Sequence, residues 1–110
     1  MTAAALCEML NLIPLAGMEG KNKEVTGGYI GDLLSWVMGR CKEGDAWITV
    51  MGNRNAVAVA LLRDVSCIIL CEDAELDADA RTKADEEGIF IVRSSLPAYE
   101  LAIRLSALLK

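Results

Sequence analysis

The most informative stretch of the sequence is Val25-Thr26-Gly27-Gly28-Tyr29-Ile30-Gly31-Asp32. We interpret it as a short strand that breaks into paired glycines and reaches Asp32, which caps a helix over residues 33–38. Adjacent glycines permit positive φ and let a ligand approach the main chain closely. Because α/β domains tend to bind ligands, anions in particular, where a strand ends and a helix begins, this stretch predicts a ligand site.

Strands and helices alternate along the rest of the chain. This alternation favours βαβ units, and hence an α/β fold: a single domain over residues 1–110 whose mostly parallel sheet has helices on both faces. Pro14 cannot donate a main-chain hydrogen bond, so its strand is expected at an edge of the sheet. The predicted strands are 12–16, the one at Val25, 46–50, 65–70 and 89–92, and the predicted helices are 3–10, 33–39, 53–62, 77–87 and one that Ser94 or Ser95 caps.

The negative net charge of the chain argues against two classes of partner. The chain has 110 residues and a net charge of −5, whereas nucleic acids and anionic membranes select basic patches. No apolar stretch approaches the roughly 20 residues of a transmembrane helix, and residues 1–8 lack the basic start of a signal peptide. We therefore expect a cytoplasmic protein with no nucleic-acid or membrane partner.

The four cysteines and the absence of histidine indicate no metal site. The cysteine spacing fits neither a CxxC pair nor a zinc site, and we expect no cofactor. Cys67 and Cys71 bracket an apolar run and are predicted in the core, whereas Cys41, in a polar turn, is predicted to be the most exposed thiol. A redox role for Cys41 or for the other pair stays open.

Five segments, 25–29, 32–34, 44–49, 53–60 and 86–89, resemble the DRTGG domain in their order, and the resemblance covers nearly the whole chain. Thr26-Gly27-Gly28 matches the end of the motif, although Lys23-Glu24-Val25 stands where its leading Asp-Arg is expected. The chain is similar to the small stand-alone DRTGG proteins of anaerobic bacteria and to the N-terminal domain of HPr kinase/phosphorylase. This resemblance implies a compact α/β domain, commonly dimeric, with a regulatory role.

Catalysis is not expected from these residues. Phosphoryl transfer on a P-loop requires GxxxxGK[ST], and neither the glycines at 27, 28 and 31 nor Gly52 is followed by that pattern. The chain also lacks histidine, the commonest general base. Carboxylates in loops, such as Glu72 and Asp73, have no visible nucleophile beside them.

A binding site is predicted where the loops after the parallel strands converge. Arg54 could hold a phosphate or carboxylate, and Asn53 or Asn55 could read an amide or a base edge. The same residue types also cap helices and shape turns, so a purely structural role remains an alternative for them. The predicted ligand-binding residues are Thr26, Gly27, Gly28, Asp32, Asn53, Arg54, Asn55, Ser94 and Ser95.

We therefore predict a non-catalytic regulatory module that senses a nucleotide-like or other anionic metabolite. The segment 55–62 is apolar on every side and the last helix carries a wide apolar stripe, which favours a homodimer. The alternative is a protein-interaction module that docks on an anaerobic redox or maturation partner through these apolar helix faces.

Overall fold

The computed structural model describes residues 1–109, so Lys110, the last residue of the predicted domain, lies outside the described residues. This part of the chain forms one five-stranded sheet in the order β1-β5-β4-β3-β2, in which β1 runs antiparallel to β5 and the other neighbours are parallel. The predicted α/β fold is confirmed, as is the place of Pro14 in an edge strand. The elements are α1 (Ala3–Met9), β1 (Ile13–Ala16), the 3-10 turn η1 (Met18–Gly20), β2 (Gly27–Ile30), α2 (Leu34–Arg40), β3 (Asp45–Thr49), α3 (Arg54–Arg63), β4 (Cys67–Leu70), α4 (Ala78–Glu87), β5 (Ile91–Arg93) and α5 (Ala98–Leu108).

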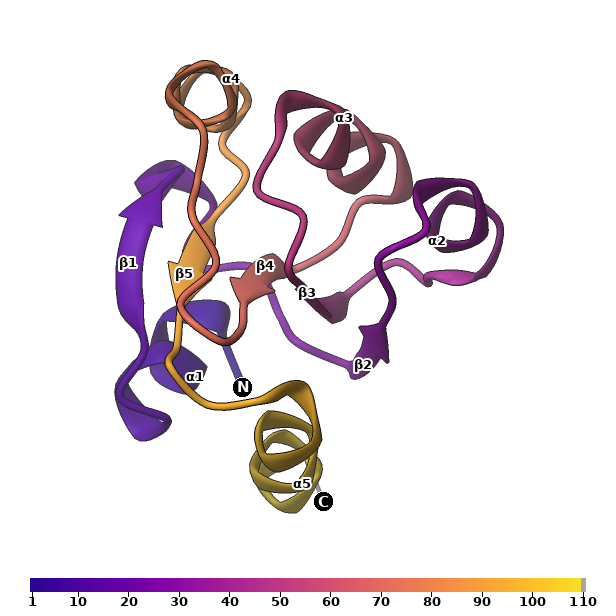
Figure 1. Cartoon of the computed structure of the whole chain (residues 1–110). Coiled ribbons are helices and arrows are strands. Elements are labelled where there is room, and N and C mark those ends of the chain that lie inside the picture. The colour runs from indigo at the N-terminus through magenta and orange to yellow at the C-terminus, as the bar shows by residue number, and fades with distance from the viewer. Residues whose placement is uncertain (110) are drawn as a thin grey trace.

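Helices cover both faces of the sheet in an unequal division (Figure 1). Strands β2 to β5 follow one another across the sheet in chain order. Because crossovers between parallel strands are right-handed, α2, α3 and α4 all lie on one face. The chain turns to the opposite face after β5, where α5 lies beside α1. The connection that follows β4 therefore leads to α4 on one face, and the connection that follows the neighbouring β5 leads to α5 on the other. The two paths diverge at the carboxyl ends of these strands.

The core consists of two apolar layers, one on each side of the sheet. Alternate residues of β4 serve the two layers, since successive side chains of a strand point to opposite faces. Ile68 and Leu70 pack with α2, α3 and α4. Cys67, Ile69 and Cys71 pack with α1 and α5, so the prediction that these two thiols lie in the core is confirmed.

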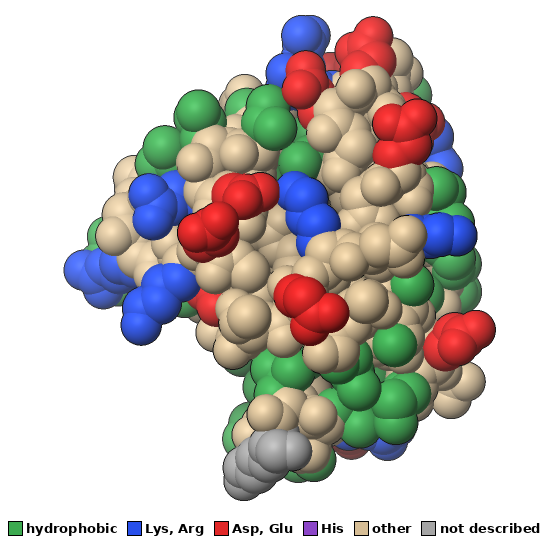
Figure 2. Space-filling view, turned by 180° about the vertical axis from the view of Figure 1, so that it is seen from behind, with side chains coloured by type: hydrophobic (Ala, Val, Ile, Leu, Met, Phe, Trp, Pro, Cys, Tyr) green, Lys and Arg blue, Asp and Glu red, His purple; other side chains and the backbone are tan. Residues whose placement is uncertain are grey.

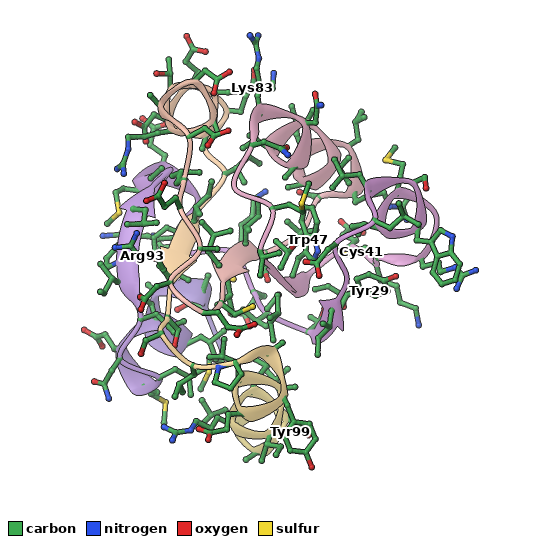
Figure 3. The ribbon with its side chains drawn as sticks, in the orientation of Figure 1. Tyr29, Cys41, Trp47, Lys83, Arg93 and Tyr99 are labelled. Carbon is green, nitrogen blue, oxygen red and sulfur yellow. The ribbon has the colours of Figure 1, made fainter. Side chains whose placement is uncertain are left out.

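Two predictions about local structure are wrong, one at β2 and one at Cys41, which follows α2. Gly27 and Gly28 do not form a turn but the first half of β2, and neither has a positive φ. Cys41 is not exposed: its accessible fraction is 0% because it packs in the layer that also holds Trp47. Figure 3 shows these two side chains between β3 and α2.

No helix among residues 1–109 is long and apolar enough to span a membrane.

The left-handed turn at Gly17 requires a glycine, and this requirement can be tested. Gly17 has φ +69°, and a Cβ there would lie 1.7 Å from the carbonyl oxygen of Ile89. We expect Gly17→Ala to lower the free energy of unfolding by roughly 2–4 kcal/mol, measured by urea denaturation, because both strain and overlap oppose the side chain. Gly39→Ala is the control: a Cβ there meets nothing within 4 Å, so the helix should gain up to about 1 kcal/mol. Equal free energies of unfolding for the two variants would contradict the requirement for glycine at position 17.

Candidate functional site

The structure separates the predicted site residues into two groups. Thr26 lies where β2 begins and donates its main-chain N–H to Gly44 at 3.0 Å, at the amino-terminal edge of the parallel strands. The segments 53–55 and 94–95 follow β3 and β5 and lie at the opposite, carboxyl-terminal edge. The predicted gathering of all nine residues in one cleft is therefore wrong.

Asp32 follows β2 and does not cap α2. The N-cap of α2 is Leu33, which makes no side-chain capping bond. The Asp32 carboxylate accepts hydrogen bonds from the Thr49 hydroxyl at 2.7 Å and from the Val50 main chain at 2.9 Å. Asp32 thus joins the loop after β2 to the end of β3. This structural role accounts for a carboxylate at position 32, and no ligand is needed to explain it.

Asn53 caps α3, as predicted. Its side-chain oxygen accepts from the main chain of Ala56 at 2.8 Å, so this oxygen is engaged by the helix. The loop before α4 packs on the same turn, where the main-chain N–H of Asp77 donates to the Gly52 carbonyl at 2.8 Å. Arg54 and Asn55 remain exposed on the first turn of α3.

Ser94 and Ser95 follow β5, and neither caps α5. The N-cap position is Pro97, without a side-chain bond. The buried Ser94 hydroxyl accepts from the Leu96 main chain at 3.0 Å. The Glu72 and Asp73 main chains donate to the carbonyls of Leu96 and Ser94 at 3.0 and 2.9 Å. These bonds join the loops after β4 and β5 where their paths diverge.

A pocket of about 240 Å³, here called the arginine pocket, lies beside this junction. Arg93 ends β5, and Figure 3 shows it next to β1. Its buried Nε has no hydrogen-bond partner among the described residues, and the nearest carboxylate oxygen, from Asp73, is 4.0 Å away. Arg104 contributes from α5 and lies 3.5 Å from Glu100. The charged and polar lining comprises Asn11, Asp73, Arg93, Ser94, Ser95 and Arg104.

Sequence reasoning found the two serines of the arginine pocket but missed both arginines. Arg93 had a usable signal, since it directly precedes Ser94 at the end of a predicted strand. Arg104 had none, because it reaches the pocket from a helix on the other face of the sheet.

Thr26, Gly27 and Gly28 line two other hollows, one on each side of β2. The hollow between β2 and α5, about 380 Å³, is here called the β2–α5 groove, and its lining carries no charged side chain. The hollow on the α2 side, about 400 Å³, includes Arg40 and Lys42 together with Glu43 and Asp45. Basic side chains gather on this side of the molecule, at the left of Figure 2.

Gly28 lies in close packing rather than in a left-handed turn. A Cβ at this position would lie 2.8 Å from the Leu105 side chain of α5. Gly27 has a similar constraint on the other face, where a Cβ would lie 2.8 Å from the Asp45 carboxylate. The predicted close approach at these glycines therefore occurs within the domain itself.

The four cysteines are free and buried. Burial, reinforced by the neighbouring Asp45 carboxylate, raises the pKa of Cys41 from 9.0 to about 11. Burial likewise raises the pKa of Cys67 to about 12. Because thiolates are the reactive form, these thiols are poor nucleophiles at neutral pH. Among residues 1–109 no group of three or more Cys, Asp or Glu side chains is arranged to hold a metal ion.

We expect the native thiols to resist iodoacetamide at pH 8, with all four labelled only after denaturation, as read by mass spectrometry. A Ser35→Cys variant supplies the control, since Ser35 is exposed on α2 and its replacement should be labelled quickly. Folding raises the pKa of Cys41 from 9.0 to about 11, so the resulting stabilisation is complete below pH 9 and disappears as the pH rises towards 11. Rapid labelling of native Cys41 would contradict this assignment.

The chain was compared with family models, with solved structures and with curated proteins. A family model described as the DRTGG domain matches residues 5–108. The structure is similar to the crystal structure of the CBS and DRTGG domains of the regulatory region of Clostridium perfringens pyrophosphatase, complexed with its activator diadenosine tetraphosphate. The TM-score is 0.73 at 12% identity, over 93% of this chain but only 44% of that one. No curated protein matches the sequence.

Proposed function

The chain belongs to the DRTGG domain family, and we propose that it is a non-catalytic regulatory module that binds an anionic, nucleotide-like metabolite in the arginine pocket. The ligand class is the one predicted from the sequence. The site keeps Ser94 and Ser95 from that prediction and replaces the exposed Arg54 with Arg93 and Arg104.

The observation that carries the proposal is the unpartnered Nε of Arg93. A buried donor without an acceptor costs free energy, typically about 1–3 kcal/mol, so native structures usually pair such groups. Arg93 lines the pocket, so a phosphate bound against its guanidinium would supply the acceptor that this side chain lacks. Arg104 lines the same pocket from the α5 side, and a second guanidinium adds charge and further donors, the arrangement that proteins use for phosphates.

The acidic neighbours do not close the pocket to an anion. Asp73 lies 4.0 Å from Arg93 and Glu100 lies 3.5 Å from Arg104, and the two carboxylate side chains are 66% and 50% exposed. Ion pairs in such exposed settings contribute about 0–1 kcal/mol. A bound phosphate can therefore replace these contacts at little cost.

The place of the pocket in the fold supports a ligand site. In open α/β sheets, ligands bind beyond the carboxyl ends of the strands, where successive connections turn to opposite faces. Here that divergence lies between β4 and β5, beside the arginine pocket. A volume of about 240 Å³ suits a phosphoryl group, since pockets for whole drug-sized ligands begin near 300 Å³. The remainder of a nucleotide would extend outward.

The related pyrophosphatase structure guides the choice of ligand. Its regulatory region is complexed with diadenosine tetraphosphate, an activator of that enzyme. Phosphate-bearing nucleotides are therefore the first compounds to test with this chain.

We also propose that the module is a homodimer and acts in the cytoplasm. Large apolar side chains remain exposed, including Ile30 of β2 at 49% and Ile103 of α5 at 53%, as expected of a surface that a second copy covers. The four unpaired cysteines suit a reducing compartment.

A thermal-shift series with inorganic phosphate, pyrophosphate, AMP, ATP and diadenosine tetraphosphate tests the ligand proposal. A ligand at 100 times its Kd stabilises the native state by about 2.7 kcal/mol, which raises the Tm by about 10 °C for a domain of this size. We expect Arg104→Gln and Ser95→Ala to remove most of this shift. Arg54→Gln, at an exposed arginine outside the pocket, is the matched control and should keep it.

Two results would contradict this assignment in different ways. A shift that Arg54→Gln removes and Arg104→Gln leaves intact would move the site to the start of α3. An unchanged Tm with every compound would contradict the ligand proposal and favour the protein-interaction alternative.

A further inference from the structure

The two edges of the sheet differ in how they are protected. At the β1 edge, Pro14 has no N–H to offer and the pairing shifts between Pro14 and Ala16. The Arg81 guanidinium also donates to the Leu15 carbonyl. Proline, irregular pairing and charged side chains are the devices by which proteins keep an edge strand from pairing with another chain.

The β2 edge has none of these devices. Its residues, Gly27–Ile30, include no proline and no charge, and no strand within residues 1–109 lies on their outer side. Thr26 directs its N–H to Gly44 on the β3 side. Because successive residues of a strand alternate in direction, the main-chain groups of Gly27 and Tyr29 point away from the sheet. Such a row of groups is a template for another strand.

The surface on the α5 side of this edge is uncharged as well. The β2–α5 groove contains Ile30, whose side chain is 49% exposed, and it continues to Ala102 and Ser106 of α5. A second uncharged hollow adjoins those two residues and includes Tyr99, which is 77% exposed. Figure 3 shows Tyr99 pointing away from the body of the domain. In a chain of net charge −5, an uncharged surface of this kind lets two copies meet without local repulsion.

We propose that β2 pairs antiparallel with β2 of a second copy of this chain about a two-fold axis at Gly28, which joins the two sheets into one. The inference rests on the homodimer proposed above and identifies its interface.

The register about Gly28 is self-complementary. It sets Tyr29 of each copy opposite Gly27 of the other, as a hydrogen-bonded pair in which the glycine leaves room for the aromatic ring. It sets Ile30 opposite Thr26, and Gly28 opposite Gly28 as a close pair with Cα atoms about 4.5 Å apart. Each large side chain therefore faces a small one. A one-residue shift would set the outward-facing Tyr29 opposite Gly28, whose main-chain groups point towards β3, and would lose the hydrogen bonds between the two strands.

The charges at the two ends of β2 favour the antiparallel orientation. Arg40 and Lys42 line the hollow at the start of the strand together with Glu43 and Asp45, and the Asp45 side chain is buried. Asp32 lies just beyond the other end and is exposed. Antiparallel pairing brings Asp32 of each copy towards the exposed Arg40 and Lys42 of its neighbour, whereas parallel pairing would place like ends together.

The mass of the full chain in solution, measured by sedimentation, tests the interface. We expect a dimer for the wild type and for Ile13→Lys, which places the same change at a 53% exposed isoleucine in the other edge strand. Ile30→Lys should raise the dimer Kd at least 100-fold and give a folded monomer, with folding checked by circular dichroism. A dimer that survives Ile30→Lys would overturn this interface while leaving the homodimer proposal intact. A monomeric wild type at 100 μM would overturn both, and the ligand proposal would still stand on its own test.

Cysteine cross-linking tests the register independently of stability. In the proposed register Thr26 faces Ile30 of the other copy as a close pair whose spacing suits a disulfide. Mild oxidation of a mixture of Thr26→Cys and Ile30→Cys proteins should give a cross-linked dimer, whereas each variant alone should not. The native thiols are at most 7% exposed and do not interfere. Equal cross-linking in the three samples, or none in the mixture of folded variants, would overturn the register.

Discussion

The right-handed crossover between parallel strands determines which face of the sheet each helix of this domain covers. Strands β2 to β5 lie in chain order across the sheet, so a constant hand of crossover places α2, α3 and α4 on a single face. The opposite face would then expose an apolar sheet to water. The α1 and α5 helices cover it, and the chain must change faces after β5 to do so. The divergence beside β5, and with it the arginine pocket, follows from this change.

The same constraint explains why most polar side chains at the carboxyl-terminal edge are engaged within the domain. Neighbouring loops that turn to the same face lie close together, and buried polar groups there need partners. Asp32 accepts from two groups at the end of β3, Asn53 accepts from α3, and Ser94 accepts from Leu96. At the divergence Arg93 retains an unpartnered Nε. This distinguishes the arginine pocket from the rest of that edge.

A sheet of this order also has two dissimilar edges. The antiparallel β1 edge carries proline, irregular pairing and a guanidinium, and these features account for its lack of further pairing. The β2 edge carries the glycines of the family motif in an extended strand, packed closely on Leu105 on one face and on Asp45 on the other. Gly28 thus lets α5 pack closely on β2. Glycines also leave the outward-pointing main-chain groups of this strand uncovered by side chains.

Four features could be predicted from local sequence: the alternation of strands and helices, the edge position of Pro14, the buried pair Cys67 and Cys71, and the cap at Asn53. Each of these depends on local pattern: hydrophobic periodicity, a missing N–H or a capping oxygen. Packing between distant segments, in contrast, places Gly27 and Gly28 in a strand, joins Asp32 to the end of β3 and buries Cys41. It also brought Arg104 to Arg93 from the other face of the sheet. These features depend on contacts between residues far apart in the chain, which spacing along the sequence does not encode.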